Sequence, residues 1–244
     1  MLPGRDSTSA ANDLDTPSSE HTRVQPVRQG RTVAVSALEY HLFQPRRAHE
    51  PLLELAYEVW REGWRNTLFE LDGRTELHSD EFARQDEIAV FTIAQHCAAV
   101  TGLRWLDLSL PRSREDSYFK HWPSEAVEKV AGRFACIASN TVVHPSWRGT
   151  RIEPPEGIGE EPMRLAFATV ALSVRRFLSS SAECLIALTR NDRSIDRMAM
   201  ALGATRLAQI QLHGIETDVI CIDRANATPH TAVVRELWQR RHHP

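Results

Sequence analysis

The sequence lacks the features of a membrane, secreted or nucleic-acid-binding protein. No apolar run approaches the roughly 20 residues that a membrane-spanning helix requires. Residues 1–30 are polar and contain no apolar stretch of the kind found in secretory signals. The net charge of -3 provides no bulk attraction to nucleic acid or to an anionic membrane surface. We therefore predict a cytoplasmic protein with no nucleic-acid partner and no membrane span.

Cysteine is scarce, and its placement excludes the usual cysteine-based sites. No two of the four cysteines have the C-x-x-C spacing of a structural zinc site, so we predict no metal centre. Each lies in an apolar, strand-like stretch, where a small thiol behaves as a core residue. We expect buried free thiols in a reducing compartment at Cys97, Cys136, Cys184 and Cys221.

The remaining composition is that of an ordinary globular protein. Hydrophobic residues make up 42% and charged residues 25% of the 244 positions, which is enough for a sizeable core. Residues 1–30 have no apolar periodicity and are rich in Ser, Thr, Asp, Pro and Gly, so we expect a disordered leader. We predict one domain over residues 31–224, followed by a tail over 225–244 with a short helix.

Apolar periodicity predicts alternating strands and helices along this domain. In the first half we expect a strand over 32–43, a helix over 48–67, a hairpin with strands 87–97 and 103–110 turning at Thr101-Gly102, and a short helix before 129. In the second half we expect strands over 134–143, 183–188, 206–212 and 218–222, and helices over 162–178, beginning at Pro162, and 194–202. This order predicts an α/β fold, with a mixed central sheet flanked by helices on both faces.

The junction after the strand 134–143 has the chemistry of an anion-binding site. Arg148 and Gly149 lie between this strand and a helix, and the free backbone N–H groups of a helix N-terminus favour negative charge. Glycine lets the backbone approach a phosphate closely, and arginine adds charge-assisted hydrogen bonds. The sequence therefore predicts a phosphate-binding loop, with an ordinary strand-to-helix connection as the alternative.

At this junction the sequence resembles a known family. Val143-His144-Pro145-Ser146-Trp147-Arg148-Gly149 is similar to the V-x-P-x-x-R-G motif of the GNAT superfamily of acyltransferases, and residues 192–204 resemble the second motif of that family. The resemblance covers about residues 32–222 and implies a GNAT-like fold. It also implies that the loop binds the phosphates of acyl-coenzyme A, or the phosphopantetheine arm of an acyl carrier protein. The donor-binding residues implied are Val143, Trp147, Arg148, Gly149, Thr150, Arg151, Gly157 and Gly159.

The sequence departs from the family pattern at two places. Residues 150–156 lengthen the phosphate loop and add two acidic side chains, so Gly157 and Gly159 are expected to restore the tight turn. The tyrosine that often protonates the leaving thiolate in this family is absent from the second motif, where Met198 and Ala199 stand.

A narrower resemblance lies in the N-terminal half. Residues 60–64, 80–82, Asp86 and 102–104 are similar in order to patterns of acyl-homoserine lactone synthases and long-chain N-acyl amino acid synthases. The resemblance implies an amine-acceptor site formed by Trp64, Asp80, Asp86 and Arg104. The alternatives are a core tryptophan and a solvated acidic loop. The Glu and Arg that these relatives carry before the phosphate loop are missing from residues 137–140, which makes lactone synthesis less favoured.

Three residues at the end of the central strand are candidates for catalysis. His144 has a reference pKa near neutrality, which suits a general base for an amine, although a structural histidine is the alternative. Ser139 and Asn140 are placed to donate hydrogen bonds to a thioester oxygen. Taken with the resemblance, these residues predict an N-acyltransferase that uses an acyl-CoA or acyl-carrier-protein donor and a small-molecule amine acceptor. The alternatives are a generic acetyl-CoA-dependent N-acetyltransferase and an inactive binding protein of the same fold.

Overall fold

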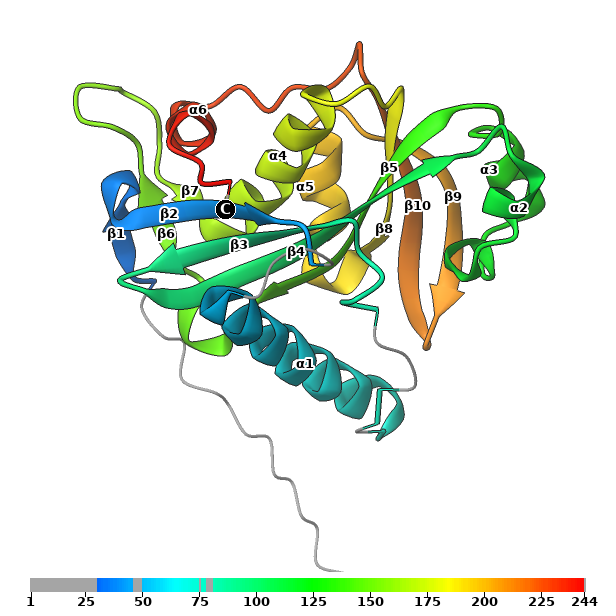
Figure 1. Ribbon diagram of the computed structural model, residues 1–244, viewed down its shortest axis with the longest axis horizontal. Coiled ribbons are helices and arrows are strands. Elements are labelled where there is room, and N and C mark those ends of the chain that lie inside the picture. The colour runs from blue at the N-terminus through cyan, green and yellow to red at the C-terminus, as the bar shows by residue number, and fades with distance from the viewer. Residues whose placement is uncertain (1–29, 46–49, 75, 78–80, 244) are drawn as a thin grey trace, which may run out of the picture.

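The protein is built around a seven-stranded mixed sheet (Figure 1). The computed structural model describes residues 30–45, 50–74, 76–77 and 81–243. The strands lie in the order β2-β3-β4-β5-β8-β10-β9, and β5 and β8 run parallel while the other neighbours are antiparallel. Their bounds are β2 Leu38–Phe43, β3 Glu87–Ile93, β4 His96–Asp107, β5 Phe134–Val143, β8 Cys184–Arg190, β9 Thr205–Leu212 and β10 Ile215–Asp223.

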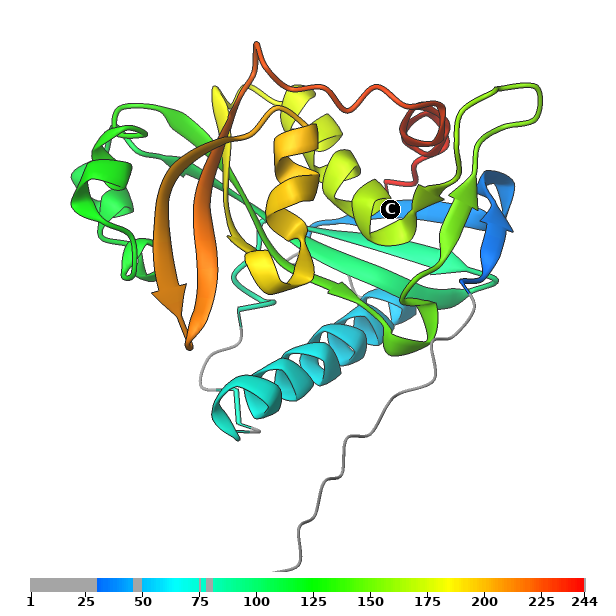
Figure 2. The same ribbon diagram turned by 180° about the vertical axis from the view of Figure 1, so that it is seen from behind.

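Helices cover both faces of this sheet, which confirms the predicted α/β class (Figures 1 and 2). The long helix α1 lies on one face against β4 and β5, and the short segments α2, η2 and α3 cover the same face farther along. Helices α4, α5 and α6 share one apolar core on the opposite face. The bounds are α1 Pro51–Asp72, α2 Pro111–Arg114, η2 Ser117–Phe119, α3 Ser124–Glu128, α4 Leu165–Leu178, α5 Ile195–Ala201 and α6 Ala232–Gln239.

The strand predicted over residues 32–43 is interrupted. It divides into β1 (Thr32–Ala34), a 3-10 turn η1 (Val35–Ala37) and β2. β1 leaves the main sheet and pairs with β6 (Arg151–Glu153), which in turn pairs with β7 (Met163–Arg164). The Val35 side chain is buried in this turn, so the interruption of the strand leaves this apolar residue covered. One stretch of chain thus contributes β1 to the three-stranded sheet and β2 to the seven-stranded sheet.

The hairpin turn predicted at Thr101-Gly102 is wrong. β3 and β4 turn at Ala94-Gln95, whose φ values of 49° and 66° match the left-handed turns that suit a two-residue hairpin. Gly102 lies inside β4, where an added Cβ would come within 2.7 Å of the Gln85 side chain. Glycine therefore stands at this position because of close packing, and the true turn uses residues that carry no strong turn signal.

The helix expected to begin at Pro162 begins at Leu165 instead. Met163 pairs with Ile152 in the β6–β7 hairpin, and this pairing keeps residues 163–164 extended. The Leu165 N–H then donates to the carbonyl of Thr150 at 2.9 Å, which brings the start of α4 back to the end of the phosphate loop. The insertion expected in that loop is therefore a hairpin that leaves and returns at the same place.

The C-terminal tail contains the predicted short helix, and this helix is part of the domain core. In α6, Val233, Val234, Leu237 and Trp238 are buried in the same cluster as α4. The helix N-terminus is closed from within the domain, because the Glu160 carboxylate accepts hydrogen bonds from the Ala232 N–H at 2.9 and 3.2 Å.

Several other expectations concern the ends and the composition of the chain. The predicted leader lies outside the described residues except for Gly30. Among the helices that the structure describes, none has the length and apolar content needed to span a bilayer. All four cysteines are buried and free, as predicted.

Candidate functional site

The central strands β5 and β8 separate partway along their length. Their parallel pairing covers Ala135–Ile137 against Cys184–Ile186, yet β5 continues to Val143 and β8 to Arg190. Figure 1 shows the two strands diverging beyond the paired part. Residues 138–140 are half-buried and Thr141 is exposed, although β5 is an interior strand. The sheet therefore has a split at its centre that bares backbone and side chains of β5.

A β-bulge lies on β5 at this split. Val100 faces Val142 and Gly102 faces Ser139, so β5 carries one more residue than β4 over this stretch. Asn140 adopts the left-handed conformation with φ 58°, and the hydroxyls of Thr101 and Thr141 are 2.8 Å apart beside it. Bulges bend a strand and re-aim its side chains, often beside a functional site. The bulge therefore directs Ser139 and Asn140 differently from a regular strand.

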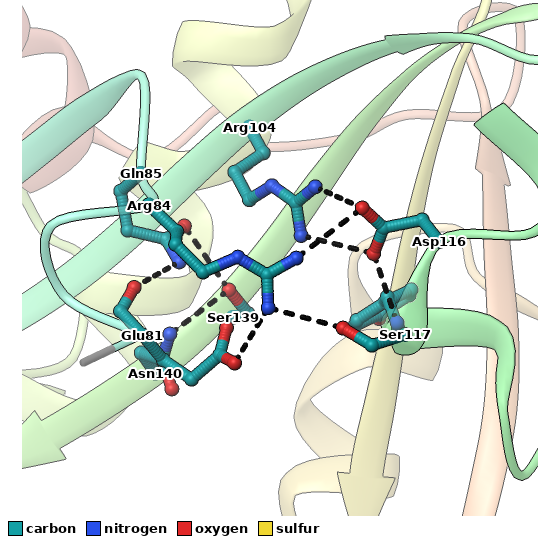
Figure 3. Close-up of polar contacts among 9 residues, drawn as sticks. Glu81, Arg84, Gln85, Arg104, Asp116, Ser117, Ser139 and Asn140 are labelled. Atoms are coloured by element: carbon teal, nitrogen blue, oxygen red, sulfur yellow. Dashed lines mark hydrogen bonds and ion pairs between the residues drawn. The ribbon is translucent and has the colours of Figure 1, made fainter. Parts of the chain in front are cut away.

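Ser139 and Asn140 are adjacent on β5, and the Gln85 side chain lies beside them (Figure 3). The Ser139 hydroxyl donates to Gln85 Oε1 at 3.3 Å, and Asn140 Nδ2 donates to Ser139 Oγ at 3.4 Å. Gln85 is almost completely buried and donates to the Glu81 carbonyl at 2.7 Å. The three side chains form one short polar chain at the split, and the role of Ser139 and Asn140 toward a thioester stays a prediction.

Beside this chain lies an ion pair between Arg104 of β4 and Asp116 (Figure 3). The two guanidinium nitrogens Nη1 and Nη2 donate to the two carboxylate oxygens at 3.3 and 2.6 Å. The side chains are only 10% and 16% exposed, so the pair is largely shielded from water. A paired, two-point geometry is the arrangement in which a shielded arginine is best stabilised.

Arg84 links this ion pair to the loop before β3. Its guanidinium donates to Glu81 Oε1 at 2.8 Å, to Ser117 Oγ at 3.0 Å and to Asp116 Oδ2 at 3.4 Å. Figure 3 shows Arg84 lying between the loop and the start of η2. Charged groups of both signs thus join residues 81–86 to residues 116–118.

The Asp116 carboxyl titrates below the usual range. Burial alone would raise its pKa, but hydrogen bonds from the Arg104 guanidinium and the Tyr118 backbone amide, with the charges of both arginines, lower the pKa further than burial raises it. Asp116 is therefore a carboxylate at every pH at which the domain is expected to function.

The residues predicted for the acceptor site lie in different environments. Arg104 is engaged by Asp116, and the Asp86 carboxylate accepts a hydrogen bond from the Trp105 N–H at 2.9 Å. Trp64 is half-buried beside the cluster that contains Val142, and in the described part of the chain its indole N–H has no hydrogen-bond partner. Asp80 lies outside the described residues. The acceptor role of these residues stays a prediction.

Sequence reasoning missed the partners of Arg104. An arginine inside the apolar strand 96–107 requires an acid nearby, since an unpaired buried charge is very costly. That signal did not identify Asp116, which stands in a run of charged residues typical of a solvated loop. Gln85 and Arg84 gave no signal, because their roles depend on contacts across the fold.

The predicted donor loop is compact and partly buried. Residues 145–147 form a 3-10 turn, η3, and Trp147 is buried in the core with the Arg31 guanidinium 4.6 Å from its ring centre. Gly149 has φ 79°, a conformation that favours glycine, and Thr150 is buried. Arg148 is exposed, and within the described residues its guanidinium makes no hydrogen bond or ion pair. Thr150 lies beside the start of α4, where its carbonyl accepts from the Leu165 N–H, and Arg148 and Gly149 directly precede it in the chain. The donor-binding role of Val143, Arg148, Gly149 and Thr150 stays a prediction.

The two downstream glycines lie elsewhere. Gly157 and Gly159 belong to the connection between β6 and β7, whose neighbouring Glu160 binds the N-terminus of α6. The hairpin projects away from the start of α4, as the green loop in Figures 1 and 2 shows. Arg151 lies at the base of this hairpin, where its guanidinium donates to the Pro162 carbonyl at 3.5 Å. Gly157 and Gly159 thus lie beyond β6, whereas Arg151 pairs with Arg164 next to the start of α4, and the donor role of all three stays a prediction.

His144 caps the N-terminus of the 3-10 turn η3. Its Nδ1 accepts a hydrogen bond from the Ser146 N–H at 3.2 Å. A neutral imidazole that accepts at Nδ1 carries its proton on Nε2, so Nε2 is a hydrogen-bond donor in this arrangement. A general-base role would require His144 to give up this contact, and it stays a prediction.

Among residues 30–45, 50–74, 76–77 and 81–243, no group of three or more His, Cys, Asp and Glu side chains is arranged to hold a metal ion.

Similarity to known proteins is found in structure and not in sequence. No family model matches the chain, and no curated protein matches it either. BjaI, a CoA-dependent acyl-homoserine lactone synthase solved with SAM and isopentyl-CoA, is 14% identical with a TM-score of 0.52, over 85% of this chain and 93% of that chain. FeeM, an N-acyl amino acid synthase from uncultured soil microbes, is 10% identical with a TM-score of 0.51, over 82% of this chain and 98% of that chain. The chain therefore has the GNAT-like acyltransferase fold, in the arrangement also found in BjaI and FeeM.

Proposed function

We propose that this protein is an N-acyltransferase that moves an acyl group from a coenzyme A or carrier-protein thioester to a small-molecule amine. The observation that carries the proposal is the split between β5 and β8, with its bulge at Asn140. A split sheet leaves backbone N–H and C=O groups without strand partners. An extended arm that contains amide groups satisfies such groups in the way that an added strand does. The phosphopantetheine arm of either donor has this chemistry.

Catalysis in such a split requires positioning and no covalent enzyme intermediate. The amine nitrogen attacks the thioester carbonyl carbon, the C–S bond breaks, and the amide product and a free thiol leave. Holding the two reactants together supplies much of the rate, and hydrogen-bond donors aimed at the developing oxyanion supply more. Ser139 and Asn140 are the donors that we assign to this role, because the bulge brings them to the split.

The phosphate end of the donor is assigned to the loop at Arg148. This exposed arginine stands beside Gly149 and Thr150, and Thr150 contacts the first residue of α4. The start of a helix of this length favours an anion, and an arginine strengthens the preference. The structure of BjaI with isopentyl-CoA supports a coenzyme A donor, and a carrier-protein donor would present the same phosphate.

The acceptor is assigned to the side of the split that carries the charged cluster. Arg84 and Arg104 are balanced there by Glu81 and Asp116, so groups of both signs lie beside Ser139. A site of this kind suits an acceptor that carries both an amine and an acidic group, such as an amino acid. The resemblance in fold to FeeM, an N-acyl amino acid synthase, supports this class of acceptor.

The test is release of free thiol from a panel of donors. Acetyl-, octanoyl- and palmitoyl-CoA and the matching acyl carrier proteins are incubated with the full chain and a mixture of amino acids, and the amide product is identified by mass spectrometry. We expect thiol release that depends on both the donor and the amine. A chain that none of these donors stabilises in a thermal shift, and that releases no thiol, would show that the proposal is wrong.

Replacing Arg148 tests the donor loop directly. We expect Arg148→Ala to weaken donor binding by about 1–3 kcal/mol, which is about 5- to 150-fold in Kd, the range for a charge-assisted hydrogen bond. Isothermal titration with coenzyme A measures the change. Arg112→Ala is the matched control, since Arg112 is also exposed but lies on α2. Equal affinities for the two variants would place the phosphate site elsewhere.

A further inference from the structure

The long helix α1 is packed into the core along its first half. Its buried residues are Leu53, Ala56, Trp60 and Gly63, whereas residues 64–72 are half-buried or exposed. Gly63 lies directly against Val142, near the end of β5, and an added Cβ would collide with the valine side chain. Beyond this contact the helix continues for about two turns past the point where core packing fixes it.

This second half of α1 spans the open end of the split between β5 and β8. β8 leads directly into the 3-10 turn η4 (Asn191–Arg193), and Thr217 of β10 pairs with Arg190, so η4 and the β9–β10 turn lie at the same end of β8. From Gly63 at the end of β5 to Glu70, α1 rises about 10 Å, about twice the spacing of paired strands. Figures 1 and 2 both show the C-terminal end of α1 close to the β9–β10 turn.

Two contacts join this end of α1 to the far side of the split. Arg193 Nη2 of η4 donates to Glu70 Oε2 at 2.7 Å. His213 Nδ1, in the β9–β10 turn, lies 2.8 Å from Asp72 Oδ2. These four side chains form a clasp across the open end of the split. Each is between 22% and 51% exposed, so the clasp opens at a modest cost in free energy.

The two acids of the clasp are poorly placed for the helix itself. Glu70 and Asp72 lie in the last turn of α1, whose sequence contains no basic residue. The C-terminal end of a helix carries partial negative charge, so carboxylates there destabilise the helix. The partners brought by η4 and the β9–β10 turn offset this repulsion, as does Arg74, which pairs with Asp72. Contacts across the split therefore account for acids that the local sequence disfavours.

We propose that the clasp sets the acceptor specificity of the enzyme, by admitting free amino acids and excluding the amines of peptides and proteins, an inference that rests on the proposed acyl transfer. The clasped half of α1 lies on the face of the sheet that carries η2 and the charged cluster, to which the acceptor is assigned. A peptide continues away from its terminal amine and needs an open groove along which to lie. A free amino acid ends within its own length, so a helix fixed across the open end obstructs the peptide and not the amino acid.

The strength of the clasp follows from its exposure. An exposed ion pair contributes little, and two together favour the closed arrangement by about 2- to 30-fold. Salt screens such pairs, because the Debye length falls to about 3 Å at about 1 M ionic strength. The discrimination against peptides is therefore finite, depends on salt and is lost when the charges are removed.

The experiment compares the double variant Glu70→Gln, Asp72→Asn with the wild type. The control is Glu58→Gln, Glu62→Gln, which removes two exposed carboxylates from the same helix, where Glu58 pairs with Arg61 of α1 itself. The kcat/KM for thiol release is measured with the best amino acid and with a short peptide that begins with the same residue. We expect the ratio of peptide to amino acid to rise by about 2- to 30-fold in the clasp variant and to stay unchanged in the control. Salt at about 1 M should raise the ratio in the wild type and leave it unchanged in the clasp variant.

The outcomes separate this inference from the function on which it rests. A wild type without turnover on any donor and amine contradicts the acyl transfer itself. An active wild type whose ratio equals that of the clasp variant overturns the role of the clasp alone, and so does a clasp variant that leaves the peptide unused. A merely structural role would lower the melting temperature without moving the ratio. If the clasp variant melts well below the control, the salt titration of the wild type decides, and an unmoved ratio overturns the inference.

Discussion

Loss of the Asp116 charge should destabilise the domain strongly, because Arg104 would remain shielded without a counter-charge. The variant Asp116→Asn keeps the shape of the side chain and one oxygen that can accept from the Tyr118 N–H. It loses the two-point carboxylate contact to Arg104, which is only 10% exposed. Removing one partner of a buried ion pair typically costs about 3–5 kcal/mol. Because Asp116 retains some exposure and the amide oxygen keeps one contact, we expect about 2–4 kcal/mol.

The assay is chemical and thermal unfolding of the variant and the wild type at neutral pH. For a domain of this size the expected loss corresponds to a decrease in Tm of roughly 4–16 °C. The double variant Arg104→Met, Asp116→Leu serves as the control, because replacing both charges with apolar groups removes the orphaned arginine. We expect its stability to lie well above that of Asp116→Asn.

The pH dependence provides an independent check on the same carboxylate. The Asp116 pKa is lower in the folded state than its ordinary value of about 3.9. The stabilisation is therefore present above pH 4 and is lost as the pH falls through the folded-state pKa. Unfolding free energy should fall more steeply below pH 4 in the wild type than in Asp116→Asn. A variant whose stability lies within about 0.5 kcal/mol of the wild type would refute the reasoning, since that is the range of an ordinary surface change.

Two further predictions concern packing and thiol reactivity. Gly102→Ala places a Cβ within 2.7 Å of the buried Gln85 side chain, so we expect a loss of about 1–3 kcal/mol in urea unfolding. Gly159→Ala, which has no neighbour within 4 Å, is the control and should be unchanged. Burial raises the pKa of the Cys97 thiol to about 12. Iodoacetamide at pH 8 should therefore leave Cys97 unmodified in the folded protein and modify it after denaturation, as peptide mass spectrometry would detect. Modification of the folded protein would contradict the observed burial.

Local patterns in the sequence were sufficient to predict most elements of this fold. Strand 134–143, the helix that became α1 and the final pair of strands each have a period that depends on neighbouring residues alone. The order of these elements then restricts the architecture to a mixed sheet covered on both faces. The turn at His213-Gly214, with φ values of 52° and 72°, was also readable from its residue types.

The candidate site was only partly predictable. Ser139 and Asn140 could be named as candidates because they lie on the recognisable strand 134–143, and Arg148 and Gly149 because they come soon after it; their roles stay predictions. The acid that pairs with Arg104, the position of Gln85 beside Ser139, and the hairpin turn at Ala94-Gln95 depend on how distant segments come together. Gln85 and Ser139 are 54 residues apart in the chain. Such contacts follow from sheet register and close packing, which a local pattern does not specify.

The sequence by itself thus determined the fold class, the place of the strand-to-helix loop at Arg148 and the burial of the cysteines, because these depend on periodicity, chain order and residue type. Only the tertiary structure decided that the loop insertion is a hairpin, that α6 belongs to the core, and that β5 and β8 separate. It also joined Arg104 of β4 to Asp116 through an ion pair between two elements that carry no shared motif. The physical reason is that burial and charge pairing act between segments that meet only when the sheet forms.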